Sequence, residues 1–110
     1  MRIFVRHLDK TTIFDVSGDV DFANSPEIRR SLLHEIQDSH TPRVVLNLSA
    51  VRYIDSSGIA SLVEALKASR DRGSRFILFG LGTSPREALQ LSRLTKVFEI
   101  YDNEVQALAS

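Results

Sequence analysis

The 110-residue sequence contains no cysteine, which excludes disulfide bonds and thiolate metal sites and makes the reducing cytoplasm the expected location. It also lacks any run that approaches the roughly 20 apolar residues of a membrane-spanning helix. The apolar stretch within residues 1–10 is short and broken by arginine, so it does not predict a signal peptide. We therefore expect a cytoplasmic protein without membrane insertion.

A surplus of charge is missing as well. Fourteen lysines and arginines are balanced by 14 aspartates and glutamates. A nucleic-acid-binding surface needs extra positive charge to neutralise phosphates, so direct binding to nucleic acid is not expected. The apolar fraction of 43% is ordinary for a globular chain. Because 110 residues is near the commonest size of one domain, we expect a single domain over residues 1–110.

Five apolar segments predict strands, at residues 2–6, 12–16, 44–48, 76–79 and 97–101. The first two alternate or are rich in β-branched and aromatic residues, and residues 7–10 between them predict a hairpin turn. The Ser-Gly-Asp sequence at 17–19 is expected to close the second strand. The third segment is almost entirely apolar, which is typical of a central strand covered on both faces.

Four other segments carry signals of helices. The first has Asn24 as its expected cap and apolar residues at every fourth position up to Ile36. The second begins at the serines 56–57 and ends at Gly73. The third starts with a capping box at residues 84–87 and runs to about Leu94, and a short last helix is capped by Asp102. Helices and strands that alternate after an initial hairpin predict an α/β fold with a mixed, mostly parallel sheet, in the order β-β-α-β-α-β-α-β-α.

One corner of this fold carries two hydroxyls. The sequence Asp55-Ser56-Ser57-Gly58 lies where a central strand ends and a helix begins, which is the edge of an open α/β sheet where ligands and chemistry collect. The free N–H groups and partial positive charge of a helix N-terminus stabilise an added anion such as a phosphate. Aspartate and serine are also preferred helix caps, so a purely structural role is the alternative interpretation.

The residues around this corner resemble a known family. The segment VVLNLSAVRYIDSSGIASLVEALKASRDRG, residues 44–73, is similar to the signature of the STAS domain and, more narrowly, to the bacterial anti-sigma-factor antagonists. Three more regions agree, at residues 17–21, 76–79 and 94–101. The resemblance covers nearly the whole chain and implies a single STAS-like domain.

The resemblance also implies a function. Members of the family bind an anti-sigma factor that is itself a serine kinase of the histidine-kinase-like ATPase type, and a PP2C-type phosphatase reverses the phosphorylation that separates the two proteins. The modified residue is the first hydroxyl after the aspartate, here Ser56, with Ser57 as the second choice. The expected partner-binding positions are Asp21, Asp55, Ser56, Ser57 and Gly58. No cofactor and no enzymatic activity are implied.

Two positions depart from the family pattern, Asn47 where many members have aspartate and Ala60 where many have glycine. Neither removes a hydroxyl or a charge from the corner, but both leave the identity of the partner open. A monomeric or weakly associating protein is expected.

Other functions remain as alternatives. A STAS subunit of a lipid-transport ABC complex would bind its ATPase constitutively. A small nucleotide-binding domain would use the loop at residues 80–84, which follows a strand but lacks a third glycine and the Walker lysine. A serine hydrolase is disfavoured because the chain has no G-x-S-x-G motif. The histidines His7, His34 and His40 do not have the spacing of metal ligands.

Overall fold

Five strands form one mixed sheet whose spatial order, β1-β2-β3-β4-β5, is the same as their order in the sequence. The computed structural model describes all residues from 1 to 110. Only β1 and β2 pair antiparallel, and every other neighbouring pair is parallel. The strands are β1 (Arg2–Leu8), β2 (Thr11–Val20), β3 (Arg43–Ile54), β4 (Arg75–Phe79) and β5 (Glu99–Tyr101). This arrangement confirms the predicted α/β fold with an opening hairpin.

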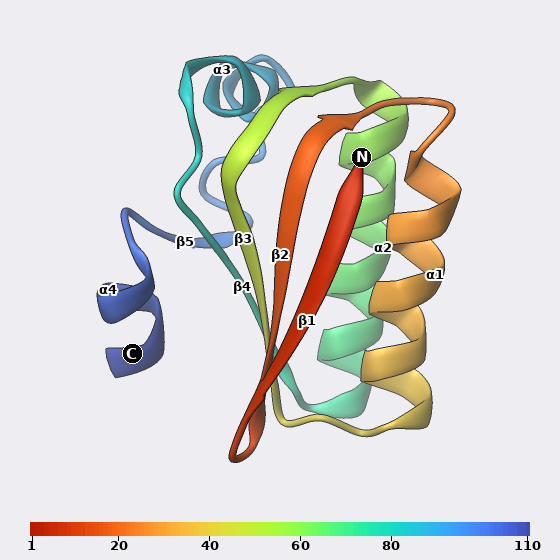
Figure 1. Cartoon of the computed structure of the whole chain (residues 1–110), viewed down its shortest axis with the longest axis vertical. Coiled ribbons are helices and arrows are strands. Elements are labelled where there is room, and N and C mark those ends of the chain that lie inside the picture. The colour runs from red at the N-terminus through yellow and green to blue at the C-terminus, as the bar shows by residue number, and fades with distance from the viewer.

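Two helices cover one face of the sheet and a short helix lies on the other (Figure 1). The covering helices are α1 (Ser25–Leu33), which continues as a π-helical turn (His34–Asp38), and α2 (Ser56–Arg72). Helix α3 (Thr83–Leu91) connects β4 to β5, and α4 (Glu104–Ala109) follows β5. None of the helices combines the length and the apolar composition that crossing a bilayer requires.

The alternation of side chains along β2 divides the core into two parts. Phe14 belongs to the larger apolar cluster beneath α1 and α2, whereas its neighbour Ile13 belongs to a smaller one beneath α4. Successive strand residues point to opposite faces, so one strand supplies both clusters. The smaller cluster is completed by Val45, Ile77 and Phe79, with Ala107 of α4 packed on them. Complete burial of a valine, isoleucine or phenylalanine side chain stabilises the fold by about 1.5–3 kcal/mol.

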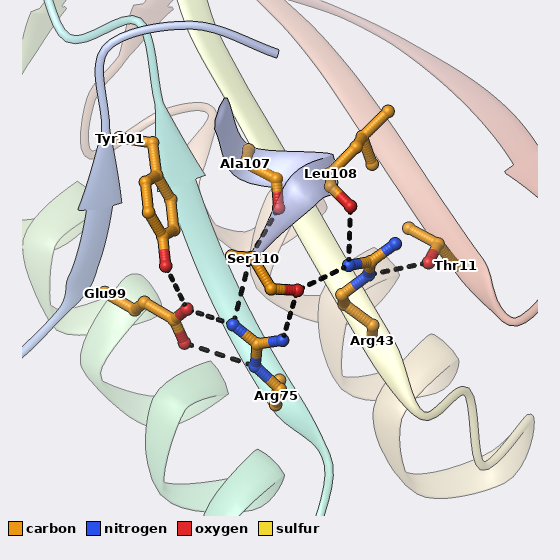
Figure 2. Close-up of polar contacts among 8 residues, drawn as sticks. All are labelled: Thr11, Arg43, Arg75, Glu99, Tyr101, Ala107, Leu108 and Ser110. Carbon is orange, nitrogen blue, oxygen red and sulfur yellow. Dashed lines mark hydrogen bonds and ion pairs between the residues drawn. The ribbon is translucent and has the colours of Figure 1, made fainter. Parts of the chain in front are cut away.

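Arginines hold α4 against the sheet (Figure 2). The Arg43 guanidinium donates hydrogen bonds to the Leu108 carbonyl oxygen at 3.1 Å and to Thr11 Oγ1 at 2.8 Å. Arg75 donates to the Ser110 carbonyl oxygen at 3.1 Å and forms an ion pair with Glu99. The segment after β5 is therefore fixed by polar contacts at its end and by apolar contacts in its middle.

The opening hairpin is tighter than expected. Leu8 pairs with Thr11, so the turn consists of Asp9 and Lys10 alone and not of residues 7–10. Asp9 adopts a positive φ of 52°, which aspartate tolerates better than most residues. A tight turn is therefore formed without the Asn-Gly sequence that usually marks one.

Strands β2 and β3 are both longer than predicted. Residues 17–19 do not end β2, because the strand stays paired with β3 through two register shifts, between Asp15 and Ser17 and between Gly18 and Asp19. Gly18 has a φ of 92°, a conformation that glycine adopts without steric cost. The last pair is Val20 with Ile54. As a result the loop after β2 and the Asp55 corner after β3 start side by side.

Two of the predicted helix caps are wrong, because other residues occupy the positions, and a third is right in its position only. Asn24 is the N-cap residue of α1, as predicted, but its side chain donates to the Asp19 carbonyl oxygen at 3.0 Å and makes no capping bond to the helix. The N-cap of α3 is Gly82, so residues 84–87 lie inside the helix. In α4 the capping oxygen belongs to Asn103, not to Asp102, and accepts from the Gln106 N–H at 3.0 Å.

The end of α3 and the start of β5 also differ from the prediction. Helix α3 stops at Leu91 and not near Leu94, because Arg93 takes a left-handed conformation with a φ of 59°. The Leu94 N–H then bonds back to the Leu89 carbonyl oxygen at 2.8 Å, as in a Schellman motif. The chain is still turning at Val97, so β5 begins only at Glu99.

Candidate functional site

The corner between β3 and α2 is organised by the carboxylate of Asp55. This residue has extended backbone angles (φ −95°, ψ −175°) and is the N-cap of α2. Its Oδ1 accepts a hydrogen bond from the Gly58 N–H at 2.9 Å, which satisfies one of the free donors at the helix start. The residue that caps α2 is therefore the aspartate and not a serine.

The second oxygen of the same carboxylate reaches a different segment. Asp55 Oδ2 accepts a hydrogen bond from the Phe22 N–H at 2.9 Å, in the loop that joins β2 to α1. The Asp55 N–H in turn donates to the Val20 carbonyl oxygen at 3.2 Å. The starts of α1 and α2 are therefore joined through one side chain at the carboxyl edge of the sheet.

Asp21 lies in the loop between β2 and α1, and its polar groups form hydrogen bonds within that loop. Its Oδ1 accepts from the Asn24 N–H at 3.1 Å, and its carbonyl oxygen accepts from the Ser25 N–H at 2.7 Å. These bonds fold the loop into the first turn of α1. The side chain is half-buried, and its hydrogen bonding gives it a role in shaping the loop.

The two serines differ in exposure. Ser56 is the first residue of α2 and is exposed, whereas Ser57 is half-buried. The Ser57 carbonyl oxygen accepts a hydrogen bond from Ser61 Oγ at 3.1 Å. Neither Ser56 nor Ser57 has a side-chain hydrogen bond within the chain, and so the exposed Ser56 hydroxyl is free to react or to contact another molecule. A phosphate on it would lie at the positive end of a 17-residue helix.

Gly58 is buried, and close packing explains why it is glycine. A β-carbon at this position would lie 2.4 Å from the Val20 carbonyl oxygen and 2.8 Å from Ile54 Cγ2. A β-carbon essentially never has non-bonded contacts this short, so any side chain would push the start of α2 away from the sheet. Gly58 thereby allows the corner to sit directly against the ends of β2 and β3.

Two aromatic side chains near the corner are exposed although the sequence alone does not single them out. Phe22 is 79% exposed and Tyr53, near the end of β3, is 49% exposed. Phe22 lies between a strand and a helix, where no periodic pattern provides a face on which to bury it. Its position in a loop is therefore the one feature of the sequence that could have predicted its exposure.

The family departures lie away from the serines or on open surface. The Asn47 side chain donates to Asp15 Oδ1 at 2.8 Å and accepts from the Ser49 N–H at 3.0 Å. An amide can bond to a neighbouring carboxylate in this way, whereas an aspartate would repel it. Ala60 is exposed on α2, one turn after Ser56.

The backbone structure explains both glycines of the loop at residues 80–84, without a role in nucleotide binding. Gly80 has a φ of 75°, which strains any other residue, and a β-carbon there would be in tight contact with the Ser49 β-carbon at 3.0 Å. Gly82 is the N-cap of α3. Elsewhere, no three histidine, aspartate or glutamate side chains are close enough together to hold a metal ion.

Comparison with known proteins finds relatives that match nearly the whole chain. The sequence model of the STAS domain matches residues 2–107. The anti-sigma F factor antagonist of Paenibacillus polymyxa is 29% identical over 108 residues, which cover 98% of this chain and 92% of that protein. The anti-sigma-B factor antagonist of Listeria monocytogenes is 30% identical over 100 residues, which cover 90% of this chain and 85% of that protein.

Solved structures share the fold. An anti-sigma factor antagonist from Mycobacterium paratuberculosis has a TM-score of 0.87 at 24% identity, over 98% of this chain and 91% of that chain. The anti-sigma factor antagonist SpoIIAA in its unphosphorylated form has a TM-score of 0.76 at 14% identity, over 98% and 94%. The phosphorylated form of SpoIIAA, from Bacillus, has the same TM-score at 18% identity, over 98% and 97%.

Proposed function

The chain belongs to the STAS domain family and, within it, to the anti-sigma-factor antagonists, and we propose that it is a binding protein switched by phosphorylation of Ser56. With Ser56 unmodified it binds an anti-sigma factor that is a serine kinase of the histidine-kinase-like ATPase type. The kinase transfers a phosphoryl group from ATP to Ser56, the complex separates, and a PP2C-type phosphatase restores the free hydroxyl. The chain is a regulator and a substrate, not an enzyme.

The exposed, unbonded hydroxyl of Ser56 on the first residue of α2 carries this proposal. A kinase can reach it without unfolding any part of the chain. The added phosphate brings about −1.5 to −2 charges, which the helix N-terminus stabilises by about 0.3–1 kcal/mol at an exposed site. That the fold of SpoIIAA is found in both the unphosphorylated and the phosphorylated form supports the same tolerance here.

The partner does not share this tolerance. A surface that accepts a neutral serine would have to accept a dianion, and uncompensated desolvation or like-charge contact costs several kcal/mol. Since about 1.4 kcal/mol corresponds to a tenfold change in affinity, this cost is enough to separate the two proteins. Asp55 and Asp21 contribute by holding the two loops of the corner in place, and Gly58 by letting α2 start close to the sheet.

The test uses purified kinases. Each serine kinase of the histidine-kinase-like ATPase type from the source organism is incubated with the chain and ATP, and the product is mapped by mass spectrometry. We expect a single phosphate on Ser56, lost in Ser56→Ala and kept in Ser57→Ala. A phosphate that persists in Ser56→Ala and vanishes in Ser57→Ala would move the site by one residue, and no phosphorylation by any of these kinases would contradict the proposal.

Binding provides the second half of the test. Ser56→Ala should bind the phosphorylating kinase as the wild type does, while Ser56→Asp should lose most of the affinity. Equal binding of both variants would contradict the switch and would instead fit constitutive binding of an ATPase, as in a STAS subunit of a lipid-transport ABC complex.

A further inference from the structure

Phe22 is an apolar side chain that the chain leaves in water next to the phosphorylation corner. It is 79% exposed, although the chain buries most of its other phenylalanines almost completely. Single exposed apolar residues are common on protein surfaces, so exposure alone does not assign a role. What distinguishes Phe22 is how firmly its backbone is held and where it is held.

Hydrogen bonds fix the backbone on both sides of Phe22. Its N–H donates to Asp55 Oδ2 at 2.9 Å, and its carbonyl oxygen accepts from Ser25 Oγ at 3.5 Å. The neighbouring Asp21 accepts bonds from the next turn through both its carboxylate and its carbonyl oxygen. The Asn24 side chain ties the loop back to the Asp19 carbonyl oxygen at 3.0 Å. The ring is thus presented from a fixed loop.

The same carboxylate links Phe22 to the modified residue. Asp55 holds the Phe22 N–H and directly precedes Ser56 in the chain. The last paired residues of the two strands, Val20 and Ile54, lie side by side, so both loops leave the same edge of the sheet. Ala60 is four residues after Ser56 and exposed, and therefore lies on the same side of α2. Its small side chain leaves this side open.

We propose that Phe22 is the apolar anchor of the kinase-binding surface and inserts into an apolar pocket of the kinase beside the site that receives Ser56. This inference rests on the proposed function, because its occupant is the same kinase. Aromatic residues, phenylalanine among them, are enriched in the buried centre of protein interfaces, and a few buried side chains there supply most of the binding energy. A ring on an already ordered loop also loses little conformational freedom on binding. Ser56 then provides the switch, and Phe22 provides affinity and selectivity for the partner.

The experiment measures the dissociation constant between the chain and the purified kinase that phosphorylates it, by calorimetry without ATP. Phe22→Ala is expected to weaken binding by about 30-fold or more, the effect of losing an interface hot spot. Phe22→Leu retains apolar volume and should recover a large part of this loss. The matched control is Val105→Ala, which removes an apolar side chain of 78% exposure from α4 on the other face of the sheet (Figure 1) and should bind like the wild type.

The outcomes separate this inference from the proposed function. If Ser56→Asp loses the kinase while Phe22→Ala binds like the wild type, the switch stands and the anchor is wrong. If Phe22→Ala binds weakly but also melts at a lower temperature, and Phe22→Leu does not recover binding, the ring has only a structural role and the inference is overturned. If none of the purified kinases binds the wild type, the proposed function and the anchor both fail.

Discussion

Gly58 lies so close to Val20 that a β-carbon on the glycine would be 2.4 Å from the valine carbonyl oxygen. This contact fixes the position of the first turn of α2 against the end of β2. The same carbonyl oxygen accepts the hydrogen bond from the Asp55 N–H, so it cannot move aside without loss. The place of Ser56 at the sheet edge is therefore set by backbone packing.

Gly58→Ala should destabilise the fold by about 1–3 kcal/mol or more, the typical cost of overpacking a tight contact. The free energy of unfolding is measured by chemical denaturation. Gly82→Ala is the matched control, because a β-carbon there meets only the Pro85 Cδ at 4.0 Å. Gly82→Ala should lower the free energy of unfolding by less than about 1 kcal/mol, the effect of replacing a glycine at a helix N-cap. Equal destabilisation by the two variants would contradict this account of the corner.

Asp55→Ala should affect two segments at once, because the carboxylate bonds to both Gly58 and Phe22. Loss of the cap costs about 0.5–2 kcal/mol, and amide hydrogen exchange should become faster both at the start of α2 and in the loop over residues 21–24. The control Asn103→Ala removes a cap that serves α4 alone and should leave exchange in that loop unchanged. Faster exchange in only one of the two segments would show that Asp55 does not couple them.

Stability should fall at acid pH through Asp15 and Glu99. Burial acts to raise the pKa of both carboxyl groups, but hydrogen bonds to the carboxylates outweigh it and lower both pKa values. The donors are Arg6 and Asn47 for Asp15. For Glu99 they are Arg75 and Tyr101. A carboxyl group whose pKa is lower in the folded state stabilises the fold above its unfolded pKa of about 4 and loses this contribution as pH falls through the folded value.

Arg6→Gln tests the share of Asp15 in this pH dependence. Arg6 Nε lies 2.6 Å from Asp15 Oδ2, and Arg6 Nη2 lies 2.5 Å from Glu104 Oε1. The Arg6 side chain is 39% exposed. Because solvent screens its ion pairs, we expect Arg6→Gln to lower the free energy of unfolding at neutral pH by only about 1 kcal/mol. The free energy of unfolding is measured by chemical denaturation at several pH values, and its difference between Arg6→Gln and the wild type should shrink as Asp15 is protonated. A difference that stays constant from pH 7 to pH 2 would show that the ion pair contributes nothing to acid sensitivity.

Arg43→Ala should loosen α4 without unfolding the rest of the chain. The guanidinium bonds to the Leu108 and Ser110 carbonyl oxygens and to Thr11 Oγ1 (Figure 2). Amide exchange in residues 104–109 should become faster, while exchange in α2 stays as in the wild type. Ser69→Ala, which removes a hydroxyl bonded within α2, serves as the opposite control. Unchanged exchange in α4 would assign its position to Ala107 and the apolar cluster alone.

The sequence predicts α2 well because both of its end signals are local. Asp55 caps the helix and Gly73 ends it with a φ of 68°, and neither choice depends on distant residues. The continuation of β2 past Gly18 could not be predicted, since it depends on pairing with residues of β3 more than 30 positions away. The missing capping bond of Asn24, the N-cap residue of α1, has the same cause, because its side chain bonds to the extended part of β2.

In the candidate site too, local features could be predicted from the sequence and long-range contacts could not. That Ser56 stands at a strand-to-helix corner follows from two adjacent patterns in the sequence. That Asp55 also holds Phe22 does not, because the two residues are 33 positions apart and meet only when β2 and β3 end together. Exposure of Phe22 is likewise a property of the assembled corner.

The agreement between strand order in the sheet and in the sequence has a consequence for how the molecule is made. The β1–β2 hairpin is closed by a two-residue turn, and each later strand adds to the free edge left by the one before it. No strand has to be inserted between two that are already joined. The sheet can thus grow as the polypeptide leaves the ribosome, N-terminal part first, and the edge with the serine corner is complete once β3 and α2 have emerged.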